Sequence, residues 1–177
     1  MTRSRAAMRR ALLSLLEHVP IETITGAMIA QRAEIGYATF FRHYADVRAL
    51  LVDTVAAVTD ELASAMMPAL LAADGGGAAS ALVGAVGSRR TMFRALLSGA
   101  GATMRAELAR QVIGRVAILP DLSPPWLPRR LAMRVAVTGT IELLDWWLSE
   151  EPDRDPAEVA ALFDRLVIGP LVDRANR

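Results

Sequence analysis

The chain has 177 residues, of which 53% are hydrophobic and 22% charged, and its formal net charge is +1. This composition suits one or two small folded domains and excludes intrinsic disorder, which requires low hydrophobicity and high charge. The absence of cysteine excludes disulfides, Cys-ligated zinc and thiol catalysis. No run of about 18–20 apolar residues is free of charges, so we expect a cytoplasmic protein without a membrane span.

Four helices are predicted in the first half of the chain, at 4–18, 25–33, 37–44 and 47–67. Apolar residues recur there at spacings of three and four, as on one face of a helix. The side chains of Thr25 and Asp46 are expected to cap the second and fourth helices. Pro20 and Pro68 are expected to end the first and the fourth.

Five further helices are predicted in the second half, at 78–86, 88–98, 102–118, 127–149 and 156–173. Asp74 and the three glycines after it are expected to form a flexible loop. No segment alternates apolar and polar residues in the way a strand requires. The fold class is therefore expected to be all-α, with about nine helices.

Residues 25–51 carry the pattern of a helix-turn-helix. Ile29, Ile35 and Phe40 are apolar where two short helices must pack on the first helix, and Ala30 is small where the two approach each other. The other positions of the second short helix carry Tyr37, Thr39, Arg42 and His43. An ordinary helical hairpin shows the same apolar spacing, but the cationic, hydroxyl-bearing face favours a helix that enters the major groove of DNA.

This segment resembles the DNA-binding segment of the TetR/AcrR (tetracycline-repressor-like) transcriptional regulators, over about residues 7–51. The residues that carry the resemblance are Ile29-Ala30, Ala33-Glu34-Ile35-Gly36, Ala38-Thr39-Phe40-Phe41, His43-Tyr44, Asp46-Val47 and Leu50-Leu51. The register is kept across them without a gap. The resemblance implies a DNA-binding domain at 1–46 and a helical effector-binding and dimerisation domain at 47–177.

Four residues depart from the usual motif of that family. Glu34 stands where glycine is usual, and if the turn needs a positive φ, a residue other than glycine costs about 1 kcal/mol there. Gly36 replaces a serine cap, Phe41 replaces a tyrosine and lacks its phenolic donor, and Val47 replaces a lysine. These departures concern contacts with phosphates rather than the fold.

The resemblance also implies which residues contact DNA. Tyr37 and Thr39 would face base edges, Arg42, His43 and Arg48 would attract phosphates, and Thr25 would cap its helix and touch a phosphate. The expected set is Arg3, Arg5, Thr25, Gly36, Tyr37, Ala38, Thr39, Arg42, His43 and Arg48.

A palindromic operator requires a two-fold protein, so we expect a homodimer. The last two long helices are apolar on several sides, which favours burial between protomers. The expected interface residues are Leu131, Val135, Thr138, Glu142, Leu162, Phe163 and Leu166. That both helices merely complete the core of a monomer remains the alternative.

Large, adaptable side chains on several helices indicate a pocket for a small apolar effector. The candidate lining residues are Met66, Met92, Phe93, Met104, Trp126, Met133 and Trp146. A methionine-rich core without a cavity explains the same residues.

No nucleophile, phosphate-loop or metal-site motif occurs, so we expect neither an enzyme nor a metal or cofactor. The net charge is unevenly distributed: residues 1–51 carry +3 and residues 52–177 carry −2.

These features predict a ligand-responsive transcription regulator, a repressor that binds a palindromic operator as a homodimer and is released by its effector. The alternative is a helical adaptor or ligand-binding protein of the same fold that has lost specific DNA binding.

Overall fold

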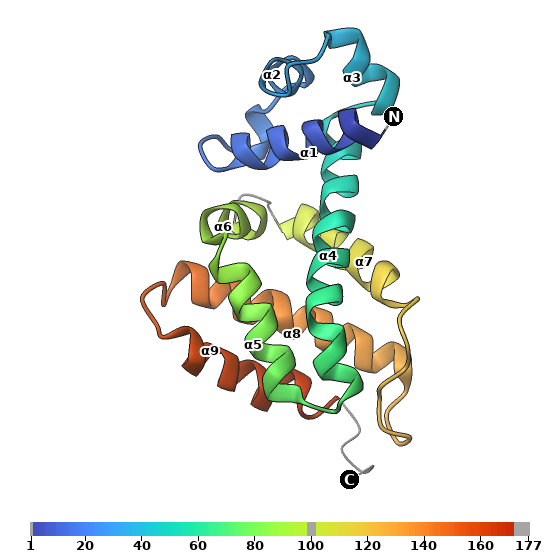
Figure 1. Ribbon diagram of the computed structural model, residues 1–177, viewed down its shortest axis with the longest axis vertical. Coiled ribbons are helices and arrows are strands. Elements are labelled where there is room, and N and C mark those ends of the chain that lie inside the picture. Colours follow the sequence, from blue (N-terminus) through green and yellow to red (C-terminus); the bar gives the residue numbers. More distant parts are fainter. Residues whose placement is uncertain (1, 99–101, 172–177) are drawn as a thin grey trace.

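The computed structural model describes residues 2–98 and 102–171, and every regular element in those ranges is helical. The first three helices form a head at one end of the molecule (Figure 1). They are α1 (Thr2–Leu16), α2 (Gly26–Arg32) and α3 (Tyr37–His43), with a 3-10 turn, η1 (Ile21–Thr23), between α1 and α2. Helix α4 (Val47–Leu71) starts in the head and runs down through the rest of the molecule.

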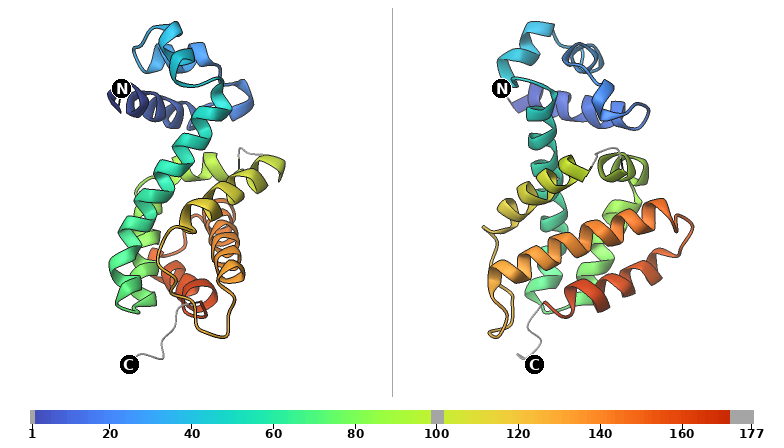
Figure 2. Two further views of the ribbon diagram at one scale, coloured as in Figure 1. Left: turned by 90° about the vertical axis from the view of Figure 1, so that its right-hand side faces the viewer. Right: turned by 180° about the vertical axis from the view of Figure 1, so that it is seen from behind.

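The body is built around α4 and α5 (Gly75–Gly87), which lie side by side. The remaining elements are α6 (Arg90–Ser98), α7 (Ala102–Val116), α8 (Arg129–Ser149), α9 (Pro156–Phe163) and a π-helical turn, η2 (Asp164–Ile168). Figure 2 shows α8 and α9 running next to each other on one side of the body. The predicted all-α fold with about nine helices is confirmed.

One hydrophobic core extends from the head into the body. Its largest fully buried side chains include Phe40 in the head and Phe163 and Trp147 in the body. Helix α5 packs on both α4 and α9, and its small side chains, Ala78 and Ala79, are fully buried between them. Within the described residues, no helix combines the length and hydropathy needed to cross a lipid bilayer.

Helix α4 does not end before Pro68, as the sequence predicts, but continues to Leu71. Proline removes one backbone donor and usually breaks a helix. Here the turn after Pro68 is held at its end, because the N–H of Asp74 donates to the carbonyl of Ala69 at 2.9 Å and that of Ala73 to Leu70 at 3.0 Å. This pair of bonds is a Schellman motif, which fixes a helix terminus.

The predicted flexible loop at 74–77 is also wrong, because the three glycines form the first turn of α5. The Asp74 carboxylate accepts a hydrogen bond from the N–H of Gly77 at 2.9 Å and so caps the helix. A Cβ on Gly77 would overlap that carboxylate, so glycine is needed for this close cap. The α4–α5 connection is therefore a tight, capped turn.

Candidate nucleic-acid interface and internal cavity

The head positions α3 through the ring of Phe40, which is fully buried against α1 and α2. Gly26, at the start of α2, lies against this ring, and a Cβ at Gly26 would sit 2.9 Å from Phe40 Cε1. Ala30 is 3% exposed in the same interface. Sequence reasoning recognised Ala30 as a point of close approach but missed Gly26, whose role depends on where the Phe40 side chain points.

The turn between α2 and α3 ends one helix and begins the next. The Thr25 hydroxyl accepts a hydrogen bond from the N–H of Met28 at 3.3 Å and caps α2. Glu34 adopts a φ of 54°, the left-handed conformation that favours glycine. Gly36 stands at the N-cap of α3 in an extended conformation and offers no side-chain cap.

The outer face of α3 is open to solvent. Tyr37 is 59% exposed, Ala38 and Arg42 are exposed, and Thr39 and His43 are half-buried. The Arg42 guanidinium donates to the Thr39 hydroxyl at 3.5 Å. This face also holds a residue outside the expected set: Phe41 is 46% exposed, and its ring meets that of Tyr37 edge-on, with the centroids 4.9 Å apart.

Three further arginines of the expected set, Arg3, Arg5 and Arg48, are exposed on the head. The Arg5 guanidinium lies 5.9 Å from the ring centroid of Tyr44, directly after α3. The start of α1 therefore lies close to the end of α3, with the Arg5 side chain exposed and the Tyr44 ring buried.

A polar cluster ties the head to α4. The Tyr44 hydroxyl donates to Asp53 Oδ2 at 2.6 Å, and Arg9 Nη1 lies 3.4 Å from the same oxygen. Burial, followed by the hydrogen bond to Asp53 and that carboxylate's charge, raises the pKa of Tyr44 to about 12. The cluster joins α1, the end of α3 and the second turn of α4.

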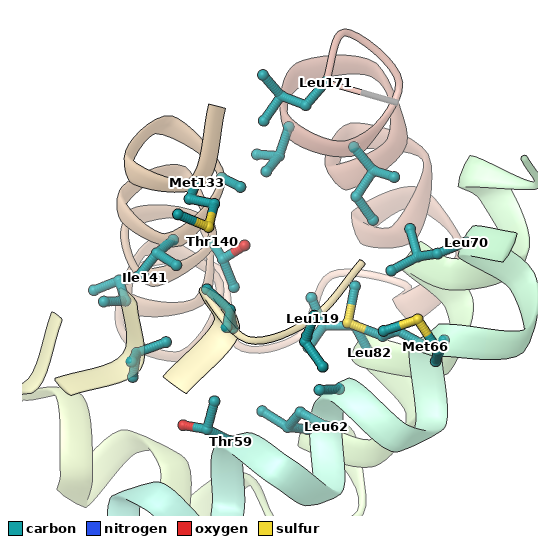
Figure 3. A pocket seen from close by; sticks show the side chains of 18 of the residues that line it. Thr59, Leu62, Met66, Leu70, Leu82, Leu119, Met133, Thr140, Ile141 and Leu171 are labelled. Atoms are coloured by element: carbon teal, nitrogen blue, oxygen red, sulfur yellow. The ribbon is translucent and has the colours of Figure 1, made fainter. Parts of the chain in front are cut away.

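The body contains a cavity of about 330 Å³ lined by parts of α4, α5, α6, α7, α8 and η2 (Figure 3). Its walls are mostly leucine, valine, isoleucine and methionine side chains. Thr59 and Thr140 are the hydroxyl-bearing residues of its helical walls among the described residues. Apolar walls with a few polar groups are typical of small-molecule sites.

Three of the seven expected pocket residues line this cavity: Met66, Phe93 and Met133. Met92 does not line the cavity, and its side chain is buried in the hydrophobic core at 4% exposure. Trp126 points outward from the connection before α8 and is 74% exposed. Trp146 stacks under the guanidinium of Arg154 instead, and the Met104 side chain lies outside the described residues.

Helix α8 contributes to the cavity a stripe that sequence reasoning missed, apart from Met133. Its lining positions recur at helical spacing: Ala132, Met133, Ala136, Val137, Thr140, Ile141 and Leu144. The same 3.6-residue period that pointed to Leu131 and Val135 on one face of this helix would have found this opposite face.

The other face of α8 is exposed, with Leu131 at 49%, Val135 at 45%, and Thr138 and Glu142 also open. Leu166, in η2, is 62% exposed, and Leu162 is half-buried. The structure corrects the expected interface at Phe163, because the ring of this residue is fully buried within the protomer. It is a core residue and cannot contact another chain.

The connection from α7 to α8 forms one edge of the cavity. Arg129 Nη2 donates to the carbonyls of Ala117, at 2.8 Å, and Leu119, at 2.5 Å, which lie just beyond the end of α7. The Asp121 carboxylate accepts from both the hydroxyl and the N–H of Ser123, and these bonds lower the pKa of Asp121. Both charged side chains thus hold the connection in place.

Ion pairs to Arg115 and Arg89 also link helix α4 to neighbouring elements of the body. Asp60 pairs with Arg115 of α7 in a two-pronged contact, and this partner lowers the pKa of Asp60. Glu61 accepts two hydrogen bonds from Arg89, at 2.7 and 3.1 Å, in the turn between α5 and α6. Asp60 and Glu61 therefore connect α4 to α7 and to the start of α6, two helices that line the cavity.

No family model and no curated protein sequence matches the chain. Solved structures share its fold over nearly its whole length. The fatty acid degradation regulator FadR from Bacillus halodurans superimposes with a TM-score of 0.68 at 14% identity, covering 97% of each chain. NalD of Pseudomonas aeruginosa, the secondary repressor of the MexAB-OprM multidrug efflux pump, gives a TM-score of 0.63 at 16% identity, covering 98% of each chain.

A third structure is FadR from Thermus thermophilus, a TetR-family transcriptional repressor in complex with lauroyl-CoA. It superimposes with a TM-score of 0.62 at 16% identity, covering 96% of each chain. The chain therefore has the fold of solved TetR-family regulators.

Proposed function

We propose that the chain is a TetR-family transcription regulator, a repressor that binds a palindromic DNA operator as a homodimer and leaves it when a small molecule fills the cavity. One observation carries this proposal: a helix-turn-helix with an exposed outer face on α3 is joined through helix α4 to a body with an apolar cavity. The fold shared with solved repressors supports it.

We divide the chain at the cap of α4, with the DNA-binding domain at 1–46 and the effector and dimer domain at 47–177. In the proposed complex α3 enters the major groove, where the exposed Tyr37, Ala38 and Arg42 and the half-buried Thr39 face bases and backbone. Arg3, Arg5 and Arg48 supply positive charge toward phosphates. The exposed aromatic pair of Tyr37 and Phe41 adds an apolar contact surface.

Control of DNA binding by the effector follows from the path of α4. A dimer places two recognition helices about 34–36 Å apart, one helical turn of DNA. A ligand that binds better to a conformation with another spacing shifts the protein away from its operator. Helix α4 can carry that shift because it lines the cavity through Thr59, Leu62 and Met66 and meets the head through Asp53.

The test is DNA binding by the full chain, measured by fluorescence anisotropy on the region upstream of its own gene and on random DNA at several salt concentrations. Specific binding is expected to exceed non-specific binding at every salt concentration. The Arg42→Ala variant is expected to weaken binding on all sequences and to reduce the salt slope by about 1, whereas Thr39→Ala relaxes base preference.

Equal affinity for both DNAs at every salt concentration would overturn the repressor proposal. The second candidate, a ligand-binding adaptor of the same fold, would then take its place. The features that favour this second candidate are Gly36, which has no capping side chain, and Phe41, which has no hydroxyl to offer a phosphate.

A further inference from the structure

The cavity offers little to a charged ligand. Among its described lining residues the only ionisable side chains are Asp121 and Arg129, and both lie at the edge formed by the α7–α8 connection. Arg129 is engaged with the carbonyls of Ala117 and Leu119, and Asp121 with Ser123. A buried charge without a partner is strongly disfavoured. An anionic ligand could pair with Arg129 only if Arg129 gave up its hydrogen bonds to the α7–α8 connection, so binding of an anion is disfavoured.

A hydroxyl group on α8 faces the empty space. Figure 3 shows the Thr140 hydroxyl directed from α8 into the cavity. Within the described part of the chain this hydroxyl has no hydrogen-bond partner, whereas the hydroxyl of Thr59, on the opposite wall, donates to the carbonyl of Val55 at 2.8 Å. Thr140 therefore has a donor to give to a ligand, and the donor of Thr59 is already used.

The volume limits the size of the occupant. An apolar protein cavity of about 150 Å³ binds benzene, with its six carbon atoms. A cavity of about 330 Å³ has room, by the same ratio, for about twelve non-hydrogen atoms. The methionines Met66, Met67 and Met133 in its walls can adapt to differently shaped apolar groups.

We propose that the effector is a neutral molecule of about twelve non-hydrogen atoms, with an apolar body and one hydrogen-bond acceptor that pairs with the Thr140 hydroxyl. A ketone, ester or ether oxygen has this chemistry. The proposal rests on the proposed function only in calling the ligand an effector. Binding itself is a property of the cavity and is measured without DNA.

Binding is tested on the full chain by isothermal titration calorimetry, which needs no probe in the cavity. Three ligands of similar size separate the possibilities: valerophenone has an acceptor, pentylbenzene lacks one, and phenylvalerate is an anion. Valerophenone is expected to bind about fivefold or more tightly than pentylbenzene, and phenylvalerate the least. Tighter binding of phenylvalerate, or of decanoyl-CoA, than of valerophenone would overturn the proposal.

The Thr140→Val variant keeps the shape of the side chain and removes its hydroxyl. It is expected to weaken valerophenone binding about five- to tenfold and to leave pentylbenzene within about twofold. Thr59→Val is the matched control, because its lost donor was not available to a ligand, and it should leave the ratio of the two affinities unchanged. If Thr140→Val weakens both ligands equally, the hydroxyl acts through packing and its proposed pairing is wrong.

Addition of valerophenone to the protein–operator complex separates the two proposals. If valerophenone binds but the DNA is not released, the effector role is wrong, whereas the proposed ligand chemistry still holds. If an anion releases the DNA but valerophenone does not, the proposed ligand chemistry is wrong, whereas the repressor proposal still holds.

Discussion

At the scale of single residues, two positions share one departure from ordinary backbone geometry. Glu34 and Ala73 have φ values of 54° and 52°, and each directly follows the C-cap of a helix. Around Glu34, the N–H of Ile35 donates to the carbonyl of Ala30 at 3.0 Å, as in the Schellman motif at the end of α4. Glycine is the usual residue at such positions because a Cβ makes the left-handed conformation costly.

The Glu34→Gly variant is therefore expected to raise the free energy of unfolding by about 0.5–1 kcal/mol, since it removes the Cβ at a positive φ. Urea denaturation measures this change. Glu34→Ala serves as the control: it removes the same carboxylate but keeps the Cβ. An equal rise in the free energy of unfolding in both variants would show that the charge of Glu34, rather than its backbone conformation, destabilises the protein.

The sequence indicated this strain at Glu34 only through comparison with the usual glycine of the resembled motif. Ala73 has the same conformation, yet no motif covers it, so nothing in the sequence pointed to it. The same limit applies to Gly26, because a close approach of 2.9 Å to the Phe40 ring depends on the packing of two helices and not on either helix alone.

At the scale of elements, the Tyr44–Asp53–Arg9 cluster fastens the head to α4. The phenol of Tyr44 ionises near its ordinary pKa of 10.0 in the unfolded chain but at about 12 in the folded protein. Between these pH values the folded state holds a proton that the unfolded state has lost. The stabilisation is therefore complete below about pH 10 and is lost as the pH rises toward about 12.

We expect Tyr44→Phe to be less stable than the wild type at neutral pH, because the hydrogen bond to Asp53 is lost. The difference should shrink as the pH rises from about 10 to about 12, since ionisation removes the advantage of the wild type. Urea denaturation across this range measures both effects. A constant difference at every pH would contradict the role of the Tyr44 proton.

The Asp60–Arg115 pair links α4 to α7, whose Val112 and Val116 line the cavity. Because the pair is exposed, Asp60→Asn is expected to change stability little. It should reduce the effect of a cavity ligand on DNA affinity more than it reduces DNA affinity itself, since it uncouples α4 from a wall of the cavity.

Fluorescence anisotropy with and without ligand measures that coupling. Arg154→Gln is the control, because it removes an ion pair of the same chemistry between Arg154, just before α9, and Glu158 of α9. An undiminished effect of the ligand in Asp60→Asn would exclude this pair from the coupling.

The sequence predicted most elements because their apolar periods and caps are local. The errors occur where a tertiary contact overrides a local signal. Pro68 is tolerated because the Schellman motif and the neighbouring α5 hold the end of α4. The glycines after Asp74 are helical because the Asp74 carboxylate caps them. In both cases, a breaker residue was compensated by a partner that its own propensity does not reveal.

At the scale of the whole molecule, α8 separates two surfaces. One stripe faces the cavity and the other, with Leu131 and Val135, is open to solvent. We expect Leu131→Asp to shift the protein from dimer to monomer, because a buried carboxylate without a partner disfavours the proposed interface. Light scattering measures the mass, and circular dichroism should show unchanged helix content, since Leu131 is 49% exposed in the protomer.

Leu71→Asp provides the control, because Leu71 is 62% exposed at the far end of α4 and outside the proposed interface. A wild-type protein that is monomeric at high concentration would contradict the two-fold arrangement. So would a dimer that tolerates Leu131→Asp but not Leu71→Asp.

The candidate sites were predictable from the sequence to different degrees. Residues of the helix-turn-helix are contiguous, so a motif places Tyr37 and Arg42 on one short helix. The cavity is assembled from six separate elements, and residue type alone cannot tell an aromatic ring in a wall from one on the surface. Phe93 lines the cavity whereas Trp126 does not, although both are large and apolar.

Trp147 and Trp126 occupy contrasting environments in the body, so the intrinsic fluorescence of the protein can report on two different regions. Trp147 is fully buried, its indole Nε1 has no hydrogen-bond partner in the described structure, and the guanidinium of Arg90 lies 4.5 Å from its ring centroid. Trp126 is 74% exposed. A soluble collisional quencher should therefore reach Trp126 first, whereas blue-shifted emission from Trp147 should persist until the body unfolds.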